Sequence, residues 1–152
     1  MAVRLIGEAV VEYIITPIVT LAICQFVKFV IESVTARRIK WGRLFNGTGG
    51  MPSSHTAFAT SITTVVGLSV GFLTPLFGVC MVFTGIVMYD AMGLRRESGK
   101  QAARINQLVD AVFETPNGLQ RLKEELGHRP LEVVVGFVAG VVIAAAFYLW
   151  VF

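Results

Sequence analysis

The feature that most constrains the fold is a long uncharged stretch in the middle of the chain. From Thr56 to Tyr89 there is no Asp, Glu, Lys, Arg or His residue. A helix that spans a membrane needs roughly 20 mostly apolar residues, so this stretch is too long for one helix. Gly71–Pro75 offers a break in its middle, because glycine and proline favour turns. The stretch therefore predicts two spanning helices, at about residues 53–72 and 75–94.

Two further apolar stretches lie near the ends of the chain, at about residues 9–31 and 131–152. Hydrophobic residues make up 55% of the chain and charged residues 15%, with a mean hydropathy of +0.71. A backbone in lipid must form its hydrogen bonds internally, and no stretch shows the alternation of a barrel strand. We therefore expect one all-α membrane domain over residues 1–152, an integral membrane helical bundle with about four transmembrane helices.

A polar segment, at about residues 95–130, separates the third and fourth apolar stretches. Apolar residues from Ala102 to Phe113 recur on one helical face. A second short helix is predicted from Thr115–Pro116, with threonine as cap and proline at the first position, to Gly127. We expect one or two amphipathic interfacial helices, either on the membrane surface or as a hairpin packed on the spans.

Small residues in the apolar stretches predict close packing. Gly67 and Gly71, and likewise Gly136 and Gly140, are four residues apart, a spacing that lets helix backbones approach each other. The sequence leaves open whether they pack within the chain or in a homo-oligomer. The two cysteines give no ligand pattern, and we expect them to be small buried hydrophobic residues.

The charged residues are distributed unevenly along the predicted helices. Of the 13 Lys and Arg residues, all but Arg4 fall at the end of the first span, the start of the second, the end of the third and the start of the fourth, or between them. We call this side of the bundle the basic face. The positive-inside rule predicts that the basic face of a multi-pass cell-membrane protein is cytoplasmic. Both histidines, His55 and His128, also fall there.

The first motif on the basic face is the segment Thr48–His55. Its glycines permit unusual backbone angles close to a ligand, and Pro52 and Ser53 suit a helix start, where free N–H groups attract anions. Ser53 and Ser54 add hydroxyl donors, and His55 could exchange a proton with a bound phosphate. On spacing alone, an ordinary capped helix after a glycine turn explains the segment equally well.

The second motif is the segment Gly127–Glu132. If the fourth span begins near Arg129, His128 and Glu132 lie one turn apart on the same side. A carboxylate bonded to one ring nitrogen would fix the tautomer of His128 and raise the basicity of the other nitrogen. Such a histidine could form a phosphohistidine intermediate. A histidine that merely ends a surface helix remains the alternative.

Cations and one buried acid complete the predicted site. Asp90 ends an otherwise uncharged helix, where an ionisable residue is usually functional or paired. Arg95 and Arg96 could clamp phosphate oxygens, or form a structural pair with Asp90. Lys28, Arg37 and Arg38 belong to a basic cluster with Trp41, which suits anionic headgroups but also serves as a topology signal.

These strings together resemble the superfamily of type 2 phosphatidic acid phosphatases and vanadium haloperoxidases. Pro52–His55 is similar to its Pro-Ser-Gly-His motif, and "TGGMPSSHTA", "MYDAMGLRR" and "LGHRPLEVVVG" resemble a divergent, short-chain membrane branch over about residues 28–140. The family's motif glycine is Ser54 here, and its nucleophile-orienting Asp is replaced by Glu132. The usual family fold has six spans, whereas this chain has room for about four.

The resemblance implies a metal-independent lipid phosphate phosphatase that needs no cofactor. His128 would be the nucleophile, Glu132 its orienting carboxylate and His55 the general acid. The substrate would be a lipid phosphate or pyrophosphate, the other partners membrane lipids, and no nucleic-acid partner is expected. The phosphate would be bound by Lys28, Arg37, Arg38, Ser53, Ser54, Asp90, Arg95 and Arg96.

Two other classes of function fit the sequence. A non-catalytic lipid-binding or scaffolding protein would keep the basic face but would need neither histidine. A small transporter or channel subunit is less compatible, because apart from Asp90 no ionisable residue lies deep in the second, third or fourth span.

Overall fold

A computed structural model describes residues 6–39, 41–44, 49–112, 121–124 and 126–152. Within these residues the secondary structure is helical and contains no strand, which confirms the all-α prediction. The elements in chain order are α1 (Ile6–Thr35), the 3₁₀ helix η1 (Trp41–Leu44), α2 (Ser54–Ser69), α3 (Pro75–Met92), α4 (Leu94–Val112) and α5 (Pro130–Val151).

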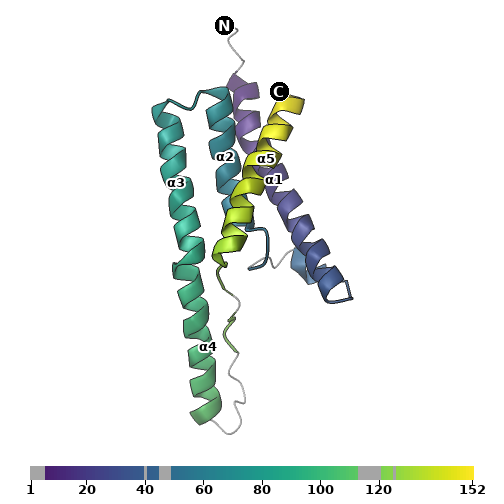
Figure 1. Ribbon diagram of the computed structural model, residues 1–152, viewed down its shortest axis with the longest axis vertical. Coiled ribbons are helices and arrows are strands. Elements are labelled where there is room, and N and C mark those ends of the chain that lie inside the picture. The colour runs from purple at the N-terminus through teal and green to yellow at the C-terminus, as the bar shows by residue number, and fades with distance from the viewer. Residues whose placement is uncertain (1–5, 40, 45–48, 113–120, 125) are drawn as a thin grey trace.

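The central element of the bundle is α2, which contacts α1, α3 and α5 (Figure 1). Its core side chains are small, and many carry hydroxyl groups. Thr63 Oγ1 lies 2.8 Å from Thr84 Oγ1 of α3, and the Thr84 hydroxyl also donates to the Ala59 carbonyl at 3.1 Å. Apolar burial gives little attraction between helices in lipid, so such hydrogen bonds and close packing hold the helices together.

Three helical stretches are long and apolar enough to cross a membrane: Val11–Thr35, Pro75–Val112 and Pro130–Val151. The second predicted span, at about residues 53–72, corresponds to α2, which has 16 residues and is packed among α1, α3 and α5. Enclosure explains why a shorter helix is sufficient there. The start of α1 and the end of α5 lie at one end of the bundle, opposite the loops of the basic face (Figure 1).

The glycines of α5 pack within the chain. A Cβ atom at Gly136 would lie 2.5 Å from the Ser53 carbonyl oxygen, and one at Gly140 would lie 2.7 Å from that of Ala57. These two positions therefore let α5 approach the first turns of α2. The other pair has a different role, because Gly67 makes room for the Phe72 ring and Gly71 adopts a positive φ of 115° in the turn before α3.

The polar segment differs from its prediction. Helix α4 forms, but it contacts only α3 among the helices and projects beyond the bundle as a continuation of α3 (Figure 1). It is therefore not a hairpin packed on the spans. Its predicted apolar face is divided: Ala102 is buried, whereas Ile105, Leu108 and Val112 are exposed. Phe113 lies outside the described residues.

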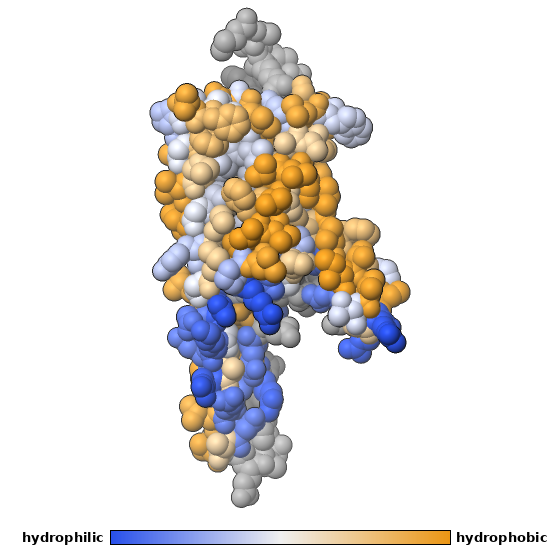
Figure 2. Space-filling model, viewed as in Figure 1, coloured by the Kyte–Doolittle hydropathy of each residue, from blue (hydrophilic) through white to orange (hydrophobic). Residues whose placement is uncertain are grey.

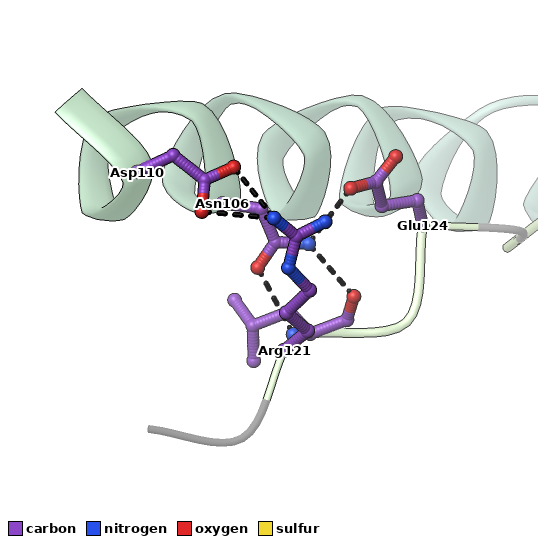
Figure 3. A network of polar contacts seen from close by, with 5 residues as sticks. Asn106, Asp110, Arg121 and Glu124 are labelled. Carbon is purple, nitrogen blue, oxygen red and sulfur yellow. Dashed lines mark hydrogen bonds and ion pairs between the residues drawn. The ribbon is translucent and has the colours of Figure 1, made fainter. Parts of the chain in front are cut away.

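The predicted second helix is wrong over residues 121–124 and 126, which are not helical; its start lies outside the described residues. Instead, this return segment runs back along α4 (Figure 3). Asn106 Nδ2 donates to the Leu122 carbonyl at 2.9 Å and Leu122 N–H donates to Asn106 Oδ1 at 3.0 Å. Arg121 pairs with Asp110 at 2.7 Å. The Asn106 side chain thus satisfies the backbone N–H and C=O of Leu122, which would otherwise form hydrogen bonds within a helix.

Hydrophobic side chains cover the visible surface of the bundle, and hydrophilic residues gather over α4 and the adjacent end of α1 (Figure 2). Large exposed apolar residues such as Phe26, Val82 and Leu149 contribute to this coat. An apolar coat of this extent requires a hydrocarbon environment. The chain is therefore a multi-pass membrane protein whose polar end projects from the bundle.

Candidate active site

Ser53 joins the starts of α2 and α5. It is the N-cap of α2, and its Oγ accepts hydrogen bonds from Thr56 N–H at 3.4 Å and from the Thr56 hydroxyl at 3.0 Å. Its backbone N–H donates to the Glu132 carbonyl at 2.9 Å. The side chain is fully buried, so the structure gives this predicted phosphate ligand a capping contact.

Lys28 brings a buried cation to the same place. Its side chain, from α1, is 1% exposed, and Nζ donates to Ser54 Oγ at 3.1 Å. Ser54 is the first residue of α2, where the helix dipole also favours an anion. A buried lysine beside a helix start forms a positive site, and Ser54 connects that site to a cavity on the other side of the helix end.

His128 and Glu132 meet as the spacing predicts. His128 Nδ1 lies 3.0 Å from Glu132 Oε2, and the same oxygen accepts a hydrogen bond from Arg129 N–H at 3.2 Å. The backbone N–H of His128 donates a hydrogen bond to the Ala91 carbonyl of α3 at 2.9 Å. The ring is 3% exposed, and this burial lowers the pKa of His128 below its ordinary 6.5, partly opposed by the hydrogen bond to Glu132. The neutral imidazole is therefore favoured.

The two histidines lie next to each other although they are far apart in the sequence. The ring centroids of His55 and His128 are 6.4 Å apart, and the ring planes form an angle of 57°. His55 is exposed and His128 is buried behind it. This separation is too large for a hydrogen bond between the rings but is comparable to the width of a phosphoryl group with its ligands.

A cavity of about 610 Å³ adjoins His55. Its polar end includes Asp90 and Arg95, which form an ion pair with Arg95 Nε 2.6 Å from Asp90 Oδ2. This contact supports the structural-pair interpretation of Asp90, although both residues also line the cavity. The remaining lining residues are Leu21, Gln25, Ser54, Phe58, Ala59, Phe83, Ile86 and Val87.

Three predicted phosphate ligands lie apart from this group. Arg37 and Arg38 are exposed beyond the end of α1, whose final turns diverge from the other helices (Figure 1). Arg37 adopts a positive φ of 50°, which turns the chain there. Arg96 is exposed on α4, and its backbone packs against Gly127. None of the three lines the cavity.

The sequence analysis missed Gln25, Phe58 and Phe83, which line the cavity. Nothing in the sequence marks the two phenylalanines as cavity-lining residues, because any apolar side chain suits a spanning helix. Gln25 does carry one: it is an amide in the first apolar stretch and lies one helical turn before Lys28. Polar side chains inside spanning helices usually have a partner or a function.

The charged and polar side chains of the site are potential ligands for a metal ion or for an anion. Among the residues that the structure describes, no group of three or more His, Cys, Asp or Glu side chains is placed to hold a metal ion. The cavity is instead suited to an anion, because Arg95 and the start of α2 line it, and the buried Lys28 contacts the Ser54 hydroxyl from behind the lining.

The chain is similar to one described family and to one curated membrane protein. The model of the Divergent PAP2 family matches residues 10–143. The chain is also 35% identical over 142 residues to the "Uncharacterized membrane protein YuiD" of Bacillus subtilis (strain 168), an alignment that covers 86% of this chain and 89% of that protein. No solved structure matches the chain significantly.

Proposed function

Because the chain belongs to the Divergent PAP2 family, we propose that it is a phosphatase of membrane lipid phosphates. The observation that carries the proposal is the approach of His55 to His128, with His128 bonded to Glu132. His55 lines a cavity together with Arg95 and with Ser54 at the start of α2, and the buried Lys28 contacts Ser54. That combination suits a phosphomonoester or pyrophosphate group on a lipid.

In the proposed reaction, the phosphoryl group lies between the two rings. His128 Nε2 attacks phosphorus while Glu132 holds the Nδ1 proton, so a phosphohistidine forms and the bond to the lipid oxygen breaks. His55 gives its proton to that oxygen and the lipid alcohol leaves. His55 then takes a proton from water, whose oxygen attacks the phosphohistidine and releases inorganic phosphate. No atom other than those of the residues, lipid and water is required.

Lys28 and Arg95 would stabilise the charge on the phosphoryl oxygens. Lys28 reaches the site through its contact with Ser54, and Arg95 lines the cavity on the opposite side, from α4. Both cations already have polar partners, which hold them in position before a substrate arrives. Preorganised positive charge lowers the barrier because it does not have to rearrange during the reaction. We propose that this face is cytoplasmic, as the positive-inside rule predicts.

A second candidate is binding of anionic lipids without catalysis. The burial of His128 favours it, because a nucleophile that is 3% exposed can attack only if substrate binding moves His55 or the adjoining backbone. A binding protein would need the cations and the cavity but neither imidazole. The two candidates therefore differ in what replacement of the histidines does.

The test is phosphate release from phosphatidate, phosphatidylglycerophosphate and isoprenyl pyrophosphate in detergent micelles with a metal chelator present. We expect turnover that vanadate inhibits, and loss of turnover in His128→Ala and His55→Ala. Arg121→Ala is a suitable control, because Arg121 is an exposed residue of the return segment. Lipid binding that persists in the double histidine variant, with no turnover by the parent protein, would support the second candidate instead.

A further inference from the structure

The cavity beside His55 is a groove between α1 and α3, which we call the α1–α3 groove. In the described residues α1 and α3 do not contact each other, and both pack on α2, which forms the floor. The polar end of the groove holds Ser54, His55, Asp90 and Arg95. Its other end is walled by Leu21, Phe58 and Phe83, and Phe83 is also exposed on the apolar coat. The groove therefore combines an anion-binding end with a hydrocarbon-like end.

Gln25 interrupts the apolar part of this groove. Its Oε1 atom is buried and has no hydrogen-bond partner among the described residues. A buried acceptor without a donor destabilises a protein, so it requires a reason, such as a ligand or an ordered water. The neighbouring lining residues Leu21, Phe58 and Ala59 offer no side-chain donor. A ligand in the groove would supply the missing donor if the Gln25 amide turned toward it.

The position of Gln25 defines where that donor must lie. Gln25 is one helical turn from Lys28, which contacts Ser54 at the anion-binding end. One turn corresponds to roughly 5 Å along the helix axis. A phosphate bound beside Ser54 and His55 would therefore place the first few carbon atoms of its ester group next to the Gln25 amide.

We propose that Gln25 determines substrate specificity, by accepting a hydrogen bond from a hydroxyl group that lies close to the phosphate in a lipid phosphomonoester. The hydrocarbon chain of that lipid lies along the apolar end of the α1–α3 groove. This inference rests on the proposed function and adds the substrate class. Lipids with a free glycerol hydroxyl next to the phosphate ester satisfy Gln25, and isoprenoid phosphates do not. Single-chain glycerol phosphates and phosphatidylglycerophosphate share this chemistry.

The test compares two synthetic substrates that differ only in the hydroxyl group: 1-oleoyl-glycerol-3-phosphate and its 2-deoxy analogue. We expect the parent protein to prefer the hydroxylated lipid by roughly five- to tenfold in kcat/KM, the effect of one neutral hydrogen bond to a buried acceptor. Gln25→Leu should bring the ratio close to one, mainly by lowering kcat/KM for the hydroxylated lipid. Gln101→Leu, an exposed glutamine of α4 outside the groove, should leave the ratio unchanged.

The outcomes separate this inference from the proposed function. Hydrolysis of both lipids at equal rates by the parent protein, or an unchanged preference in Gln25→Leu, would overturn the role of Gln25 alone. If neither lipid is hydrolysed, the phosphatase proposal fails, and native mass spectrometry of the same pair bound to the parent and Gln25→Leu proteins still decides whether Gln25 recognises the hydroxyl. Measuring kcat/KM for phosphatidylglycerophosphate in parallel shows whether the protein prefers that lipid or the single-chain glycerol phosphate.

Discussion

His128 Nδ1 lies 3.0 Å from Glu132 Oε2, across the first turn of α5. The contact directs the other ring nitrogen, Nε2, away from Glu132 and leaves it available for chemistry. The same carboxylate oxygen also caps the helix through Arg129 N–H. One side chain thus fixes both the tautomer of the histidine and the start of the helix that carries it.

Glu132→Gln should lower kcat by about 100-fold or more with a smaller effect on KM, because the amide can stabilise the wrong tautomer of His128. The hydrogen bond to Glu132 raises the pKa of His128, so its loss should also move the imidazole titration to lower pH. Enzyme kinetics and NMR of a histidine-labelled sample measure the two effects. Glu97→Gln, which changes an exposed carboxylate on α4, is the control. An unchanged kcat would remove Glu132 from the mechanism.

The pH dependence follows from the lowered pKa of His128. Because burial keeps the folded-state pKa below 6.5, the nucleophile should stay neutral as the pH falls to that value. We expect the acidic limb of kcat/KM to lie below pH 6.5, with activity lost as the pH falls through the folded pKa. An acidic limb of kcat/KM that lies above pH 6.5 would contradict this assignment.

The same shift affects stability. Between the lowered folded pKa and 6.5 the unfolded chain binds more protons than the folded one, so the free energy of unfolding should rise with pH in that window. His128→Asn should reduce this slope, because asparagine does not titrate. Thermal unfolding in detergent at several pH values measures it. An equal slope in the variant would show that other groups cause the pH dependence.

Close packing of α5 on α2 predicts a large effect of two small substitutions. Gly136→Ala and Gly140→Ala would each place a methyl group against backbone carbonyl oxygens of residues 53 and 57, and each should destabilise the fold by about 1–3 kcal/mol. Because residue 53 precedes the histidine of α2, Gly136→Ala should also reduce activity. Gly85→Ala is the matched control, since its Cβ meets nothing within 4 Å. Similar melting temperatures for all variants would contradict the packing.

The side-chain amide of Asn106 makes three of the hydrogen bonds that hold the return segment on α4. Asn106→Ala removes the hydrogen bonds to Leu122 and the one to Glu124, so the segment should lose its attachment to α4. We expect faster hydrogen exchange at the Leu122 amide and faster proteolysis of the segment, whereas Gln101→Ala should behave as the parent protein. Unchanged exchange at that amide would mean that the Arg121–Asp110 ion pair alone is sufficient.

The parts of the fold that the sequence predicts are those set by local patterns. Apolar length locates the spans, and the four-residue spacing of His128 and Glu132 is enough to predict their contact. Counting helix ends also places His55 and His128 on one face of the bundle, whereas their approach to each other depends on the packing of α5 on α2. These inferences need no knowledge of how the helices pack laterally.

The predictions that the structure contradicts fail because of contacts between residues far apart in the sequence or because of the path of the backbone. The return segment has helical periodicity, but hydrogen bonds from Asn106, 16 residues away from Leu122, replace those of a helix. Arg37 and Arg38 fall outside the site because a positive φ at Arg37 redirects the chain after α1. The unpartnered oxygen of Gln25 depends on which side of α1 is covered.

The separation of α1 from α3 has a kinetic consequence. A lipid that enters sideways between these helices comes from the surrounding leaflet and not from water. Its rate of capture therefore depends on its concentration per area of leaflet and not on its concentration per volume of solution. Diluting a phosphorylated lipid with neutral phospholipid at constant bulk concentration should then slow its capture in proportion to its mole fraction. Encounter frequency would be governed by lateral diffusion and by the composition of the leaflet on the polar side.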